Sequence, residues 1–308
     1  MEEVTVLMSV LNGMPYLPEA VDSIRYQTFQ HFRFLIINDG STDGSQDYLG
    51  GLNDHRIQTI YQSTAGLGAA LNAGLALCET EFIARMDADD IALASRLEQE
   101  IEFLKCHKEI GLTGCQISYI AKGSRTGMSS QLPCLHERIF EDLLNGEHAM
   151  CHPTVMCRTS LLKEIGGYRI SGVGQDLDMF LRMGEVSRLA NLEKMLLLYR
   201  TYEGSVNTTR RREVQERCAH AIQCARQRAV DRAEPSFEEF LGIWRTRPLW
   251  QRATESLDIY ASYQYRHAVA DMLGSHCLRG YARLGWAAVC SPMRAVRRVV
   301  RAIRSRNG

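Results

Sequence analysis

The sequence predicts an α/β protein with a mostly parallel sheet flanked by helices, followed by a C-terminal all-helical extension. Short apolar runs alternate with helix-like segments in the first part of the chain. Near-continuous apolar strands in this alternation are typical of parallel sheets buried on both faces. Residues 209–308 show no strand signal. We therefore expect two regions, residues 1–208 and residues 209–308.

The strands are expected where compact apolar runs of strand length occur. A helix is expected over residues 18–28, because a proline suits a first helical turn and apolar residues follow at helical spacing. A second helix is expected over residues 68–78, and Gly166 with Gly167 is expected to end a later one. The predicted strands cover residues 4–10, 32–38, 57–61 and 82–86.

Three carboxylates, Asp87, Asp89 and Asp90, directly follow the fourth predicted strand. Burying unpaired charge is costly, so such a cluster faces water, a cation or both. Oxygen ligands suit Mg²⁺ or Mn²⁺, ions that commonly bridge protein carboxylates to substrate phosphates. The alternative is a solvated acidic turn, in which Asp90 caps a helix that begins near Leu93.

A second acidic loop, residues 38–44, follows the second predicted strand. It matches the first half of a calcium loop, but Gly50 stands where that loop needs a bidentate glutamate, so we reject a calcium site. A capped strand-to-helix turn explains most of its composition. Because ligands bind beyond the carboxyl ends of parallel strands, Asp39 and Asp87 are expected to face one cleft.

Seven blocks of sequence follow one another in a specific order. They are SVLN at 9–12, INDGSTD at 37–43, NAG at 72–74, ARMDADD at 84–90, HPTVM at 152–156, EIGGY at 164–168 and QDLD at 175–178. Together they resemble family 2 glycosyltransferases over residues 4–206. The resemblance implies a GT-A, Rossmann-like domain and an inverting enzyme that uses a nucleotide-activated sugar.

The resemblance also implies a donor site. Asp39 is expected to contact the pyrimidine base of a UDP- or dTDP-sugar, Asp87 to face the ribose and sugar, and Asp89 to ligate Mn²⁺ or Mg²⁺ on the diphosphate. Arg200 is either a diphosphate contact or part of a surface salt bridge. The residues implied to bind the nucleotide sugar are Ser9, Val10, Asn12, Asp39, Asp87, Ala88 and Arg200.

Asp176 matches the family's catalytic base, which takes the proton of the acceptor hydroxyl. Its alternative role is to cap the N-terminus of a helix over residues 177–183. Gln175 replaces a frequent glutamate, which favours ionisation of Asp176 by removing a like charge. Tyr202 replaces a histidine that helps to bind metal or diphosphate in some relatives, which weakens the expected metal site. His152 is expected to orient a loop or touch the acceptor.

The zero net charge of the chain hides a division between its two regions. Residues 209–308 hold 19 arginines and no lysine against nine acidic residues, whereas residues 1–208 carry a net charge of −10. Residues 293–306 place apolar side chains at helical spacing among six arginines. This segment is expected to bind an anionic membrane surface, to pack on the acidic domain or to form a dimer contact. Nucleic-acid binding is not expected, since no recognised module accompanies the charge.

The composition is typical of a cytoplasmic enzyme, with peripheral contact to the inner membrane face as an option. The 308 residues are 45% hydrophobic, enough for a full core, and no apolar stretch of spanning length occurs. The acidic start, Glu2 and Glu3, does not resemble a secretory signal. The ten scattered cysteines are expected to be reduced, without disulfides.

Two functions follow from these patterns. The first is an active inverting transferase that acts on a saccharide or lipid-linked acceptor in the synthesis of a bacterial surface polysaccharide. The second is a catalytically weakened family member that binds a nucleotide sugar and serves a structural or regulatory role. A sugar nucleotidyltransferase is disfavoured, because the N-terminal glycine-rich phosphate loop of such enzymes is absent.

Overall fold

The computed structural model describes residues 2–121, 124–169, 173–201, 211–251 and 277–292, and residues 254, 257, 260, 261, 264 and 268. The chain forms two compact units. The larger unit holds the described residues between 2 and 201 together with Arg212–Glu234, and the smaller holds Arg211 and the described residues from Pro235 onward. The boundary predicted at residues 208 and 209 lies outside the described residues and stays a prediction.

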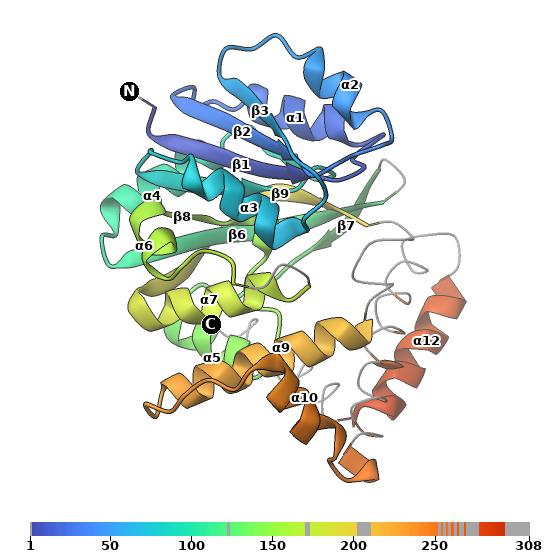
Figure 1. Cartoon of the computed structure of the whole chain (residues 1–308). Coiled ribbons are helices and arrows are strands. Elements are labelled where there is room, and N and C mark those ends of the chain that lie inside the picture. Colours follow the sequence, from blue (N-terminus) through green and yellow to red (C-terminus); the bar gives the residue numbers. More distant parts are fainter. Residues whose placement is uncertain are drawn as a thin grey trace. The chain divides into compact units, whose positions relative to one another are not determined.

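Four parallel strands form one half of the sheet in the larger unit (Figure 1). Val4 pairs with Phe32 on one side and with Phe82 on the other, so the first strand is central. The carboxyl ends of the second and fourth strands therefore meet at one edge of the sheet. These strands are β1 (Val4–Val10), β2 (Phe32–Asn38), β3 (Ile57–Tyr61) and β4 (Phe82–Met86), and their bounds confirm the prediction.

The other half of the nine-stranded sheet is mixed. From β4 it continues through β8, β6 and β9 to β5, and β7 pairs with β6. β8 runs antiparallel to both β4 and β6, whereas β9 runs parallel to β6. The predicted parallel arrangement thus describes the N-terminal half. The additional strands are β5 (Ile91–Ala92), β6 (Ile110–Ala121), β7 (Ser124–Ser129), β8 (Met156–Arg158) and β9 (Arg188–Arg200).

Helices cover both faces of this sheet and form two separate apolar cores (Figure 1). One face carries α1 (Leu17–Arg25), α2 (Ser45–Gly50) and α4 (Arg96–Cys106). The other carries α3 (Leu67–Ala76), α5 (His136–Leu144), α6 (Thr159–Glu164), α7 (Gln175–Val186) and α9 (Arg211–Arg228). In α1, α4 and α5 the buried side chains recur at helical spacing, as expected of helices that pack one face on an apolar sheet. In α7 the six consecutive residues 178–183 are buried.

Two predicted helix boundaries can be compared directly with the structure. The helix expected near Leu93 begins at Arg96, because β5 and a turn come first. The stop predicted at Gly166 and Gly167 is confirmed: both residues have positive φ, and the Gly167 amide donates to the Leu162 carbonyl 2.9 Å away. A side chain at such φ values would be strained, so glycine is required there.

The described part of the C-terminal region is helical, as predicted. Besides α9 it contains α10 (Phe237–Arg245) and α12 (Cys277–Cys290). Ser236 and Glu239 form a capping box at the start of α10. The predicted basic helix over residues 293–306 and Tyr202 both lie outside the described residues. Among the helices that the structure describes, none combines the length and apolar character needed to cross a bilayer.

A buried ion pair fixes α4 against the end of β4. Arg96 Nε lies 3.2 Å from Glu100 Oε1, and both side chains are fully buried. Arg96 also donates to the carbonyl oxygen of Arg85 at 2.7 Å. Desolvation outweighs the charge of Arg96 and raises the pKa of Glu100 to about 7.

Glu100→Gln should remove a pH dependence of stability. The folded pKa of Glu100 lies above its usual 4.5. The Glu100 carboxyl group therefore contributes fully to the free energy of unfolding below about pH 4.5. The contribution is lost as the pH rises through the folded pKa, by about 3 kcal/mol in total. Urea unfolding should therefore show that the free energy of unfolding falls more between about pH 5 and about pH 8 in the wild type than in the variant. Glu102→Gln, at an exposed position of α4, is the control and should behave as wild type.

Candidate active site

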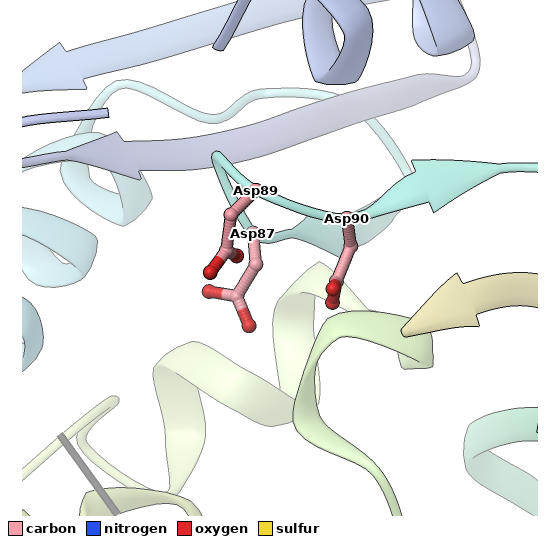
Figure 2. A group of neighbouring side chains, drawn as sticks. All are labelled: Asp87, Asp89 and Asp90. Carbon is pink, nitrogen blue, oxygen red and sulfur yellow. The ribbon is translucent and has the colours of Figure 1, made fainter. Parts of the chain in front are cut away.

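Three carboxylates gather at the end of β4. Asp87, Asp89 and Asp90 lie in the loop between β4 and β5, and one oxygen from each lies within 4.8 Å of the others. Figure 2 shows the three side chains projecting to the same side of the loop. Asp87 and Asp89 are partly exposed, whereas Asp90 is 1% exposed. The predicted acidic cluster therefore forms, and its oxygens converge.

The charges in this cluster favour a cation. Burial, and then the charges of Asp87 and Asp89, raise the pKa of Asp90 well above its ordinary value. Asp90 Oδ1 accepts a hydrogen bond from the Arg200 amide at 2.8 Å, while the buried Oδ2 has no hydrogen-bond partner. Asp90 therefore links the acidic loop to the end of β9 and does not cap α4. An orphaned carboxylate oxygen beside two further carboxylates fits a hard divalent ion.

Arg85 is a site residue that the sequence analysis missed. Its side chain is 2% exposed, and Nη2 lies 2.5 Å from Asp87 Oδ1. A buried charge needs a partner, and Asp87 supplies it as an ion pair, although none of the three guanidinium nitrogens of Arg85 has a hydrogen-bond partner. The signal in the sequence was a single arginine inside the apolar run of β4, one residue before Met86.

Arg200, at the end of β9, supports the acidic loop directly. Its Nε donates to the Asp89 carbonyl at 2.7 Å, and Nη2 lies 2.5 Å from Glu19 Oε2. Its guanidinium also stacks over Tyr16, 4.3 Å from the ring centroid. The predicted alternative of a salt bridge is thus present, but the side chain is buried, so this is a structural clamp rather than a surface pair.

Asp39 follows the end of β2. The strand β1 lies between β2 and β4, the strand that carries the acidic loop. Since neighbouring strands are about 4.8 Å apart, β2 and β4 are separated by about 10 Å. The buried Asp39 carboxylate accepts hydrogen bonds from Gln62 Nε2 at 2.7 Å and from the amides of Ala65 and Gly66 at 2.8 and 2.9 Å. It therefore pins the segment that leads into α3.

The turn after β1 is bound to the loop after β2. The amide of Asn12 donates to Ser41 Oγ at 3.0 Å, and Asn12 Oδ1 accepts from the Thr42 amide at 2.8 Å. Asn12 has a φ of 56°, a value that asparagine tolerates better than most residues. Ser9 is partly exposed, whereas the Val10 side chain lies in the core and its carbonyl accepts a hydrogen bond from the Asp39 amide at 2.8 Å.

Asp176 lies in the first turn of α7. The helix begins at Gln175 with Gly174 as its N-cap, so the alternative in which Asp176 caps a helix from residue 177 is wrong. Burial raises the pKa of Asp176 and the charge of Asp87 raises it further, whereas the Leu177 amide and the charge of His148 lower it. The charge of Asp87 is the smallest of these influences on the pKa of Asp176.

His152, the remaining predicted site residue, is buried. It lies in a 3-10 turn before β8, its Nε2 is 2.9 Å from the Tyr168 hydroxyl, and its ring meets those of Tyr168 and Phe180 edge to face. Burial, and then the charge of Arg85, lower its pKa well below the usual value. A neutral imidazole in this position packs the loop between α5 and β8 against Tyr168 and Phe180.

The model of a family described as Glycosyl transferase family 2 matches residues 5–166, which is more than half of the chain. The chain belongs to glycosyltransferase family 2. This transferase is 30% identical over 216 residues to the putative glycosyltransferase EpsE of Bacillus subtilis (strain 168), covering 66% of its own length and 74% of that relative. It is 27% identical over 214 residues to the amylovoran biosynthesis glycosyltransferase AmsE of Erwinia amylovora, covering 67% and 79%.

The fold of the transferase is also that of a solved glycosyltransferase structure. S. aureus TarS 1-349 in complex with UDP-GlcNAc aligns with a TM-score of 0.62 and 17% sequence identity, covering 95% of this chain and 92% of that one. At this identity the likeness concerns the fold alone. The predicted fold and family are therefore confirmed, whereas the binding roles of Asp39, Asp87 and Asp89 stay predictions.

Asp39→Ala should loosen the segment before α3. The variant removes the acceptor of two backbone hydrogen bonds, and bonds to a charged group contribute about 1.5–3 kcal/mol each. Hydrogen exchange of the Ala65 and Gly66 amides should accelerate by about tenfold or more. Asp39→Asn retains one acceptor oxygen and should give a smaller increase. Asp47→Ala, at an exposed position of α2, serves as the control, and equal exchange in all variants would refute the pinning role of Asp39.

Proposed function

We propose that this glycosyltransferase is an inverting enzyme that moves a sugar from a UDP- or dTDP-sugar to a hydroxyl of a saccharide or lipid-linked acceptor. The observation that carries the proposal is the carboxylate cluster at the end of β4, whose Asp87 also raises the pKa of Asp176. TarS, described in complex with UDP-GlcNAc, supports a uridine donor. AmsE, described as an amylovoran biosynthesis enzyme, supports a role in the synthesis of a bacterial surface polysaccharide.

In this proposal the donor lies across the carboxyl ends of β1, β2 and β4. The turn with Ser9, Val10 and Asn12 holds the nucleoside, and Asp39 faces the pyrimidine base through the lone pair left over from its three hydrogen bonds. Asp87 and Ala88 face the ribose and sugar. Asp89 would ligate Mn²⁺ or Mg²⁺, which supplies charge neutralisation for the leaving diphosphate.

The proposed base is Asp176. Its carboxylate takes the proton of the acceptor hydroxyl while the hydroxyl oxygen attacks the anomeric carbon and the bond to the diphosphate breaks. Attack from the face opposite the leaving group inverts the anomeric configuration without a covalent intermediate. Arg200 steadies the far side of the site through the Asp89 carbonyl, and His152 orients the loop before β8 or touches the acceptor.

Asp176→Asn should reduce kcat by about 10²–10⁴-fold, because the amide cannot accept the proton. Burial raises the pKa of Asp176, so wild-type activity should rise with pH through a midpoint above the usual range of aspartate. The measurement is transfer from a labelled nucleotide sugar across a pH series. Asp178→Asn, two residues along α7 and bound to Arg182, should keep the same acid limb even if its stability falls. Equal rates in Asp176→Asn and wild type would exclude Asp176 as the base.

Asp89→Ala should remove most activity and abolish its dependence on added Mn²⁺ or Mg²⁺. The reason is the loss of one of three converging oxygen ligands. A thermal shift titration with Mn²⁺ and a nucleotide sugar provides a readout that does not need turnover. An unchanged metal response in Asp89→Ala would contradict the assignment, while Asp47→Ala should respond as wild type.

The alternative is a catalytically weakened subunit that binds a nucleotide sugar. Its support is Gln175, whose buried Oε1 has no hydrogen-bond partner, in the position where relatives often carry a glutamate. The same thermal shift experiment separates the two functions. Stabilisation by the nucleotide sugar without any transfer or hydrolysis would favour the subunit. We further propose that the enzyme works in the cytoplasm, with residues 209–308 as the region for peripheral membrane or dimer contact and no role in nucleic-acid binding.

A further inference from the structure

The helix α12 is red in Figure 1. Four of its large apolar side chains are exposed. Leu278, Tyr281, Trp286 and Val289 recur at helical spacing, so they share one face. They are exposed, with Leu278 at 88%, Val289 at 70% and Trp286 at 54%. The opposite face carries the buried small residues, Gly280 and Ala287. Leu284, on the same side as Gly280 and Ala287, is partly exposed. The other large apolar residues of α12 face solvent, unlike those of a usual surface helix.

This outward face needs an occupant, because monomeric proteins rarely expose contiguous apolar surface without a binding role. Ala282 and Gly285 fill the remaining positions of the face and are exposed as well, so no charged side chain interrupts it. We call the surface formed by these six residues, Leu278, Tyr281, Ala282, Gly285, Trp286 and Val289, the outer face of α12.

The charge around the outer face identifies the kind of occupant. Arg279 and Arg283 lie one turn apart along one border of the face. From residue 277 to residue 308 the sequence contains eight arginines and no acidic residue. A basic border beside an apolar face matches an anionic lipid surface, where headgroups attract arginine and the acyl boundary accepts apolar side chains. Tryptophan and tyrosine are enriched at that boundary.

The described length of α12, Cys277–Cys290, is too short to span a bilayer. Its 14 residues extend over about 21 Å, shorter than a hydrocarbon core of about 30 Å. A helix of this length with one apolar face lies in the plane of the interface.

We propose that the outer face of α12 inserts into the headgroup boundary of an anionic membrane and anchors the transferase there. This goes beyond the proposed reaction and does not depend on it. Membrane contact through α12 would hold the enzyme near a lipid surface whatever its acceptor is.

The test is co-sedimentation of the full chain with vesicles of phosphatidylcholine and with vesicles that also contain phosphatidylglycerol. The wild type should bind the anionic vesicles, and high salt should weaken the binding. The double variant Leu278→Ser with Val289→Ser should lower the partition coefficient by at least about tenfold, because two apolar anchors are lost. The control is Leu135→Ser, which changes an equally exposed leucine of the larger unit and should bind as wild type.

A second readout follows Trp286 itself. In a Trp244→Phe, Trp250→Phe background it is the sole tryptophan, and its emission should shift to shorter wavelength on addition of anionic vesicles. Circular dichroism confirms that each variant is folded. Equal vesicle binding by wild type and the double variant, or an unshifted Trp286 emission, would overturn the proposal. A dimer that the double variant disrupts, with vesicle binding unaffected, would assign the outer face to a second copy of the chain. Transfer to a water-soluble saccharide is measured separately and tests only the proposed function.

Discussion

The structure of the site depends on holding three like charges together at the end of one strand. The carboxylates of Asp87, Asp89 and Asp90 repel one another, and burial makes the repulsion stronger because the surroundings screen it less. Three buried arginines on different elements support the loop that carries these carboxylates. Arg85 pairs with Asp87, Arg96 binds the Arg85 carbonyl, and Arg200 binds the backbone and side chain of the loop. β4, α4 and β9 thereby fix one loop.

The same constraint explains why the sheet has its second, mixed half. Arg200 reaches the acidic loop because β9 pairs with β5, which directly follows Asp90 in the chain. The Arg200 amide and Asp90 are 110 residues apart in sequence, yet they share a hydrogen bond of 2.8 Å. The antiparallel strands are therefore part of the support of the site, and the parallel half supplies the edge at which Asp39 and Asp87 emerge.

The two units of the chain use charge and apolar surface in opposite ways. In the larger unit arginines are buried and neutralise carboxylates, as in the pairs of Arg85 with Asp87 and Arg96 with Glu100. On α12 of the smaller unit arginines border an outward apolar face instead. Buried pairs fix the elements that carry them, whereas an exposed basic and apolar helix is suited to binding an anionic surface.

The sequence by itself determined the four parallel strands, the convergence of the acidic loop and the family. Local apolar runs fix strands because a strand buried on both faces needs little else, and the ordered blocks around Asp39, Asp87 and Asp176 are specific. Only the tertiary structure showed that Arg85 pairs with Asp87, that Arg200 is a clamp and that Asp39 pins the segment before α3. It also decided the strands β5 to β9 and the first turn of α7. The contacts of Arg200 and Asp39 join residues far apart in the chain, and the Arg85–Asp87 pair depends on the burial of Arg85. The spacing of residues along a sequence contains neither.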